Sequence, residues 1–244
     1  RFIELARQIA GQWDRLADSD RQRREFVANI SHDLRTPLTS LLGYLETLSL
    51  KADRLTMEEN KQYLNIALRQ GNKVRHLSQQ LFELARLEHG GIKPQPETFV
   101  LAELVQDVAQ KFDLPVATRN IGLQLELAAG LPPVTADLSM IERVLTNLLD
   151  NAIRHTPEGG VIRLAARRAG PEIIVEVADS GPGIAGELRA TLFERPSVLE
   201  PGAQSASRGG LGLMIVRRML QLHGGDIRLL EAPAGACFQF TLPV

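Results

Sequence analysis

The stretch FVANISHDLRTPLTSLLGYLETL, residues 26–48, decides the fold of the N-terminal third of this chain. Its apolar residues recur at steps of three and four, the pattern of an amphipathic helix with one buried stripe: Phe26, Ile30, Leu34, Leu38, Leu41, Leu45 and Leu48. At ~100° per residue, His32 falls on the side of the helix opposite that stripe. The sequence therefore predicts a helix that exposes an imidazole to water.

Two neighbours of His32 suggest a chemical role for that imidazole. Asp33 can accept a hydrogen bond from one ring nitrogen, which fixes the tautomer and leaves the other nitrogen free to attack. Pro37 lacks an N–H and its ring crowds the carbonyl of Asp33, which favours a bend beside the reactive side chain. The spacing by itself also fits a solvated surface histidine that precedes a helix-kinking proline.

The flanking segments predict a helical hairpin. Residues 1–25 continue the helical period without a proline, so the first helix is expected to run to about Lys51. A polar break at 52–56 precedes a second helix, from about Met57 to Glu88, with a narrow apolar stripe of its own. A two-helix hairpin is too thin to bury both stripes, so the pattern predicts a homodimer that forms a four-helix bundle.

Composition narrows the class of protein. The chain has 244 residues and a formal net charge of -1, which gives no reason to expect nucleic-acid binding. Cys237 is the single cysteine, so an intrachain disulfide is excluded. No apolar run approaches the ~20 residues that span a bilayer. Because the chain opens on Arg1 in helical register, we expect a cytoplasmic fragment of a longer protein.

A linker separates this hairpin from a second domain of another kind. Gly and Pro interrupt all helical pattern over residues 90–96. Beyond them, strands are expected at 121–127, 161–167, 173–178, 227–230 and 237–242, helices at 101–112, 138–155 and 210–222, and loops at Pro115 and Pro132. Helices collected against a mixed sheet predict an α/β sandwich.

The helix at 138–155 carries an unusual polar face. Asn147, Asn151, Arg154 and His155 fall together on it at steps of three and four. Amide oxygens suit Mg²⁺, which takes oxygen ligands and keeps nucleotide phosphates in its shell. Considered alone, the segment also fits a solvated polar face.

Two glycine-containing segments follow. Asp179-Ser180-Gly181-Pro182-Gly183 ends an apolar strand, and a carboxylate beside permissive glycines suits recognition of an amino group such as that of adenine. Gly209-Gly210-Leu211-Gly212 opens an apolar helix, whose free N–H groups favour phosphate. Either segment alone would be weak evidence, because the first also fits a tight turn.

The motif S-H-D-L-R-T-P-L at 31–38 resembles the phosphoacceptor box of bacterial sensor histidine kinases, and the match is nearly unbroken over residues 24–44. The resemblance implies that His32 becomes phosphorylated. It implies that Asp33 assists proton transfer, and that Thr36 positions a water for dephosphorylation of a partner.

The three segments of the second domain, in their order and spacing, resemble the N box and glycine boxes of the GHKL ATP-binding domain. The resemblance implies that Asn151 coordinates Mg²⁺ with Asn147 beside it, and that Arg154 reaches the phosphates of ATP. His155 would take the place of the aromatic residue that packs on adenine, and Asp179 would bind the adenine amino group. The backbone would close on the nucleotide at Gly181, Gly183, Gly210, Leu211 and Gly212.

Together these resemblances divide the chain into four parts. Residues 1–20 are similar to the end of a HAMP linker, 21–89 to a dimerisation and histidine phosphotransfer domain, and 97–244 to the GHKL ATP-binding domain, with 90–96 as linker. Within 192–207, a predicted mobile lid, Pro196 departs from the family pattern, and Arg208 does so just after it.

The implied function is that of a protein-histidine kinase. Such a chain would autophosphorylate His32 from Mg-ATP and pass the phosphoryl group to an aspartate of a response regulator. It would also dephosphorylate that regulator, and the full-length protein would lie in the bacterial inner membrane. The alternatives are a GHKL-type ATPase without phosphohistidine, a phosphatase-dominant sensor with weak kinase activity, and a non-enzymatic scaffold. Transfer within one subunit and transfer between two both remain open.

Overall fold

The computed structural model describes residues 2–51, 54–88, 91–189, 192–193, 210–232 and 234–244, and leaves out the side chains of 2–20, 22–23, 25–26, 187 and 210. It divides into two compact units, a helical unit of residues 1–79 and an α/β unit of residues 80–244. None of the described helices is both long enough and apolar enough to cross a membrane.

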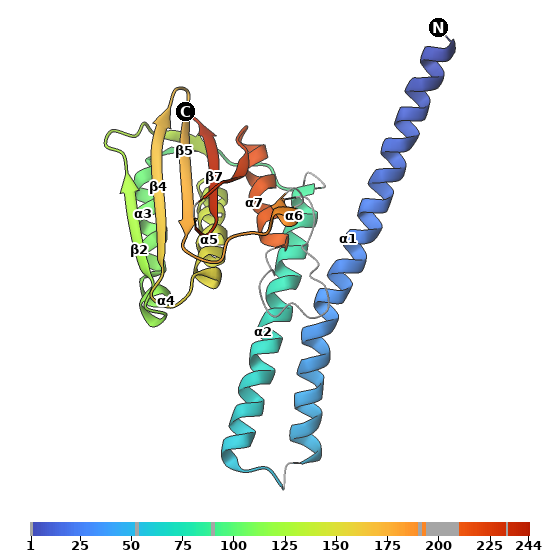
Figure 1. The fold of residues 1–244 in the computed structure, drawn as a ribbon, viewed down its shortest axis with the longest axis vertical. Helices are drawn as coiled ribbons and strands as arrows, with labels where there is room; N and C mark the ends of the chain where they lie inside the picture. Colours follow the sequence, from blue (N-terminus) through green and yellow to red (C-terminus); the bar gives the residue numbers. More distant parts are fainter. Residues whose placement is uncertain (1, 52–53, 89–90, 190–191, 194–209, 233) are drawn as a thin grey trace. The chain divides into compact units, whose positions relative to one another are not determined.

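Two long helices form the predicted hairpin (Figure 1). They are α1 (Phe2–Leu50), which continues through Pro37, and α2 (Met57–Glu88). Thr56 and Glu59 start α2 with a reciprocal capping box, because the Thr56 N–H donates to Glu59 Oε2 at 2.9 Å and the Glu59 N–H donates to Thr56 Oγ1 at 3.2 Å. These hydrogen bonds also lower the pKa of the Glu59 carboxyl. The local sequence therefore determines where the second helix begins.

The α/β unit is built on a five-stranded sheet in the order β2-β4-β5-β7-β6. Only β2 and β4 are parallel; the other neighbours are antiparallel. The strands are β2 (Gly122–Leu127), β4 (Val161–Ala169), β5 (Glu172–Asp179), β6 (Ile227–Leu230) and β7 (Cys237–Pro243).

Three helices cover one face of this sheet (Figure 1). They are α3 (Leu101–Lys111) along β2, α5 (Leu138–His155) along β5, and α7 (Gly210–Leu222) along β6 and β7. Alternate strand residues such as Leu164, Val175 and Phe240 are buried beneath them. The predicted α/β sandwich is confirmed.

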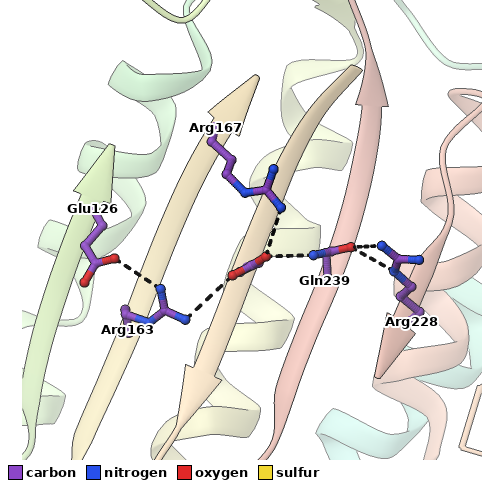
Figure 2. Close-up of polar contacts among 6 residues, drawn as sticks. Glu126, Arg163, Arg167, Arg228 and Gln239 are labelled. Atoms are coloured by element: carbon purple, nitrogen blue, oxygen red, sulfur yellow. Dashed lines mark hydrogen bonds and ion pairs between the residues drawn. The ribbon is translucent and has the colours of Figure 1, made fainter. Parts of the chain in front are cut away.

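The other face of the sheet carries a row of polar side chains, shown in Figure 2. Glu176 accepts from Gln239 Nε2 at 2.7 Å and lies 3.6 Å from Arg163 and 3.7 Å from Arg167. Arg163 continues to Glu126, and Arg228 donates to Gln239 Oε1 at 2.8 Å. The row crosses all five strands, so this face is stabilised by polar pairs and the apolar core lies on the helical side.

Four short elements are absent from the sequence prediction. They are α4 (Asp113–Thr118), α6 (Gly186–Arg189), and the antiparallel pair β1 (Glu97–Phe99) and β3 (Val134–Ala136). Three to six residues are too few to display a period. The loop predicted at Pro115 is wrong, because Pro115 lies in the first turn of α4, where its missing N–H needs no helical partner.

Candidate functional site

Helix α5 presents the polar face that the sequence predicts. Asp137 caps it, since its Oδ1 accepts from the Met140 N–H at 3.0 Å. Ile141, Val144 and Leu148 are completely buried, and the helix packs on the sheet with α3 and α7 as its neighbours. Burial of that apolar face fixes the rotation of the helix about its axis, which sets the direction of its asparagines.

The two asparagines of α5 have unused hydrogen-bonding capacity. The Asn147 side-chain nitrogen is buried and has no partner within the part of the chain that the structure describes. Asn151, one turn further along, is partly exposed, and the structure records no side-chain hydrogen bond between it and the described residues. Buried polar groups in native proteins are nearly always paired, so an unpaired amide indicates a partner from outside the described residues.

Asp179, at the end of β5, is a buried carboxylate with one oxygen still available. Its Oδ1 accepts from the Gly181 N–H at 2.8 Å and from the Ala236 N–H at 3.3 Å. No hydrogen bond to Oδ2 is recorded from any described residue. Burial raises the pKa of this carboxyl, while the two backbone donors and nearby His155 act in the opposite direction. The free oxygen is therefore a strong acceptor in a poorly hydrated position.

Gly181 joins the end of α5 to the loop after β5. A Cβ at this position would lie 2.6 Å from the His155 carbonyl oxygen and 2.8 Å from Asp179 Oδ1, so only glycine fits. Burial and the charge of Arg154 lower the pKa of His155, and Asp179 partly offsets this. The structure therefore brings His155, Asp179 and Gly181 together, with a neutral imidazole favoured beside the carboxylate.

Two further glycines pack closely beside Asp179: Gly183, in the loop after β5, and Gly235, just before β7. Gly183 has φ +77° and would place a Cβ 2.9 Å from the Gly235 carbonyl oxygen. Gly235 has φ +72°, and a Cβ there would overlap the Asp179 carbonyl. Sequence reasoning missed Gly235 and Ala236, because only the pairing of β5 with β7 brings them to Asp179.

The third predicted segment opens α7. Gly210, Leu211 and Gly212 form its first turn, and the Leu211 side chain is buried, which leaves its backbone for any ligand. Pro196 and Arg208 lie outside the described residues. Phe193, at the start of the predicted lid, packs edge-on against Phe238 with ring centroids 6.2 Å apart.

His32 is displayed on α1 in the helical unit. Its side chain is 73% exposed, and its Nδ1 lies 3.7 Å from Asp33 Oδ1. Thr36, one turn later, donates its hydroxyl to the His32 carbonyl at 3.2 Å. The exposed imidazole and its acidic neighbour are arranged as the helical period predicts.

Comparison with known families covers both units. Residues 22–90 match the His Kinase A (phospho-acceptor) domain, and residues 136–244 match the family described as histidine kinase-, DNA gyrase B-, and HSP90-like ATPase. The alginate biosynthesis sensor protein KinB of Pseudomonas aeruginosa is 34% identical over 226 residues, which are 92% of this chain and 38% of KinB. The chain thus spans well under half of that relative.

Two solved structures are also similar. The catalytic domain of histidine kinase ThkA is 32% identical with a TM-score of 0.54, over 61% of this chain and 95% of that one. ThkA in complex with the response regulator protein TrrA has a TM-score of 0.75 at 27% identity, over 94% of this chain and 66% of that one. The chain therefore belongs to the histidine kinases, with a phosphoacceptor domain followed by an ATP-binding domain of the type shared with DNA gyrase B and HSP90.

Proposed function

We propose that this chain is a kinase core that transfers the γ-phosphoryl group of ATP to Nε2 of His32. The observation that carries the proposal is the exposed imidazole with a carboxylate beside Nδ1, in the same chain as an ATP-binding domain whose described residues leave the buried Asn147 amide unpaired. Because Nδ1 faces Asp33, Nε2 is the nitrogen with a free lone pair. The same arrangement is what an activated nucleophile requires.

The α/β unit supplies a donor and acceptor set that fits a nucleotide. Asp179 Oδ2 would accept from the adenine amino group and His155 would pack against the base, since both lie at the corner formed by Gly181 and Gly183. Asn147 and Arg154 would donate to the phosphates, together with the backbone of Gly210, Leu211 and Gly212 at the start of α7. Asn151 would offer its amide oxygen to Mg²⁺, which neutralises phosphate charge when bound.

The chemical step balances without further groups. The Nε2 lone pair forms a bond to the γ-phosphorus while the bond to the β,γ-bridging oxygen breaks, and ADP leaves with that electron pair. The ring becomes a phosphorylated imidazolium, whose Nδ1–H faces the negative charge of Asp33. Asp33 therefore stabilises the charge that develops on the ring during attack.

We propose that the phosphoryl group then passes to an aspartate of a response regulator, as the solved complex of ThkA with TrrA supports for a related kinase. We assign the phosphatase reaction, in which water hydrolyses the aspartyl phosphate of the regulator and releases inorganic phosphate, to Thr36. Its hydroxyl donates to the His32 carbonyl, which leaves its lone pairs free to orient a water. The longer protein would add a sensor and a membrane anchor, because this chain spans only 38% of the sensor protein KinB.

A second copy of the chain would complete the helical unit. Leu38, Leu42 and Leu45 on α1 and Leu64 and Leu68 on α2 are 44–58% exposed in the single chain. A cavity of about 240 Å³ lies between the two helices, lined by Leu41, Leu45, Leu64, Ala67, Leu68, Gly71 and Asn72. Exposed apolar stripes of this kind mark helix-packing surfaces, so we propose a dimeric four-helix bundle.

Radiolabelled ATP tests the kinase assignment. His32→Gln is expected to abolish incorporation of label while ATP affinity, measured by calorimetry, stays within about twofold of wild type. Asn151→Ala is expected to lose both label and Mg-ATP affinity. His76→Gln, at another exposed histidine of the hairpin, is the matched control and should label normally.

The stability of the label in acid and alkali separates the alternatives. A phosphohistidine is labile in acid and stable in alkali. ADP production without such a label, at equal rates in wild type and His32→Gln, would instead identify an ATPase of the gyrase type. Phosphate loss from a labelled regulator, faster with wild type than with Thr36→Ala, would support the phosphatase assignment.

A further inference from the structure

Arg119 fastens the end of α5, although it lies outside all three nucleotide-site segments. It follows α4 and precedes β2 in the chain. Its guanidinium donates through one terminal nitrogen to the Ile153 carbonyl, and through the other to the Thr156 carbonyl at 3.0 Å. Both acceptors belong to the last turn and C-cap of α5, on either side of His155.

The last carbonyls of a helix have no partner inside the helix, and a cation there also interacts favourably with the helix dipole. At the end of α5, two different side chains donate to carbonyls of this kind. Thr156 is 1% exposed and donates both its N–H and its hydroxyl to the Ala152 carbonyl, at 2.9 and 2.7 Å. Arg119 supplies the donors for the Ile153 and Thr156 carbonyls, so two carbonyls at the α5 terminus depend on a residue more than thirty positions earlier.

The backbone next to Arg119 is tied to the same region. Asn120 has φ +52°, and its carbonyl accepts from the Gly159 N–H at 2.9 Å. The Gly122 N–H donates to the Gly160 carbonyl at 2.9 Å. Hydrogen bonds along their whole length therefore join the turn at 119–122 to the segment 153–160.

The last turn of α5, which Arg119 holds, packs against the residues of the candidate base site. The His155 carbonyl lies where a Cβ on Gly181 would approach within 2.6 Å, and Gly181 in turn donates to Asp179. Such close packing leaves no room for α5 to shift at this end without moving His155 relative to Asp179. Asn151 lies one turn and Asn147 two turns before His155 in the helix.

We propose that Arg119 is a positioning residue for base recognition, which holds the last turn of α5 so that His155 and Asp179 keep the geometry that selects adenine. The inference rests on the proposed nucleotide site and adds a specificity determinant to it. Loss of the guanidinium frees the two carbonyls that flank Arg154 and His155, while the other proposed phosphate contacts, Asn147 and the first turn of α7, lie outside this turn. The expected defect is therefore in the choice of base and in nucleotide affinity, not in the rate of phosphoryl transfer.

The test compares ATP with GTP, whose bases differ and whose triphosphates are the same. Arg119→Met removes the donors and keeps a long side chain, and Arg119→Lys keeps a charge with fewer donors. Arg168→Met is the matched control, because Arg168 is an exposed arginine whose Nε donates only to Gly170, at the far end of β4. Calorimetry gives the affinities, and labelling gives KM and kcat.

We expect Arg119→Met to weaken ATP binding about tenfold, the size of a lost charge-assisted hydrogen bond, and to leave GTP binding within about twofold. KM for ATP should rise with kcat nearly unchanged. Arg119→Lys should recover part of the ATP preference, and Arg168→Met should match wild type.

An equal loss of affinity for ATP and GTP, or an unchanged ratio in both Arg119 variants, would overturn the proposal. If Arg119→Met does not fold, the ratio for Arg119→Lys decides. A wild-type chain that binds no ATP would refute the nucleotide site and this inference together. A wild-type chain that binds ATP without labelling His32 would refute only the kinase step, since the calorimetric ratio still tests Arg119.

Discussion

In Asp179, backbone hydrogen bonds fix one carboxylate oxygen and leave the other for a ligand. Two backbone N–H groups occupy Oδ1, and the second oxygen remains available in a buried setting. A charged acceptor makes stronger hydrogen bonds when little water competes for it. The price in stability is the burial of a charge, which is why the pKa of this carboxyl is raised.

Asp179→Asn should separate these two effects. Because the folded-state pKa lies above the unfolded one, the ionised carboxylate destabilises the fold above the folded pKa, and the effect disappears below the unfolded pKa. The wild type should therefore lose stability relative to Asp179→Asn as the pH rises through this window. Urea unfolding at a series of pH values measures the difference, and calorimetry should show that the variant has lost ATP affinity.

Asp107→Asn is the control for this pH series, since Asp107 is exposed on α3. A stability difference between wild type and Asp179→Asn that does not change with pH would contradict the raised pKa. Retention of full ATP affinity would contradict the adenine role.

Gly181→Ala tests the closeness of α5 and the loop after β5. The added methyl would lie 2.6 Å from a backbone oxygen that cannot rotate away, so we expect about 1–3 kcal/mol of destabilisation and a lost ATP site. Gly186→Ala is the control, because a Cβ there meets no described atom within 4 Å. Thermal unfolding and nucleotide titration of the two variants give the comparison. Equal stability and ATP affinity in both would show that the backbone around Gly181 can shift to admit a methyl group.

Helix α5 is also held at its first turn, by the hydrogen bonds of Asp137. Asp137 caps it through Oδ1, accepts the Gln95 N–H on Oδ2 at 2.9 Å, and donates its own N–H to His223 Nε2 at 3.0 Å. His223 Nδ1 lies 2.7 Å from the Met219 carbonyl, which makes Nδ1 the protonated nitrogen. One junction therefore joins Gln95, the start of α5 and the end of α7.

Asp137→Ala should destabilise the α/β unit by about 1–2 kcal/mol, as expected for loss of an N-cap with a further partner. Asp137→Asn keeps an oxygen for the Met140 N–H but replaces the acceptor for Gln95, so its loss should be smaller. Urea unfolding gives both values. Equal losses in the two variants would show that the cap itself contributes little.

For the molecule as a whole, the exposed leucines of the hairpin predict an obligate partner. Leu45→Asp should raise the dissociation constant of the dimer more than tenfold, because burial of a leucine contributes roughly 2 kcal/mol and the carboxylate cannot be buried unpaired. Sedimentation velocity measures the change, with Glu46→Asp, at an exposed neighbour, as control. A wild-type chain that is monomeric at micromolar concentration would contradict the four-helix bundle.

The sequence by itself determined the parts of the molecule that depend on local periodicity and local caps. The bounds expected for α5 and α7 are those observed, and α2 begins at Met57 because Thr56 and Glu59 cap it within four residues. The exposure of His32 follows in the same way, since a helical period places every side chain relative to the apolar stripe. Residue types in a known order were enough to indicate the family.

Only the tertiary structure decided which distant residues meet. Gly235 and Ala236 reach Asp179 through the pairing of β5 with β7, and Arg119 reaches the end of α5 through the packing of the turn before β2. The burial of the Asn147 amide, which has no partner among the described residues, likewise depends on neighbouring elements. These contacts join positions far apart in the chain, and their geometry is set by close packing of the folded unit, which no local pattern in the sequence encodes.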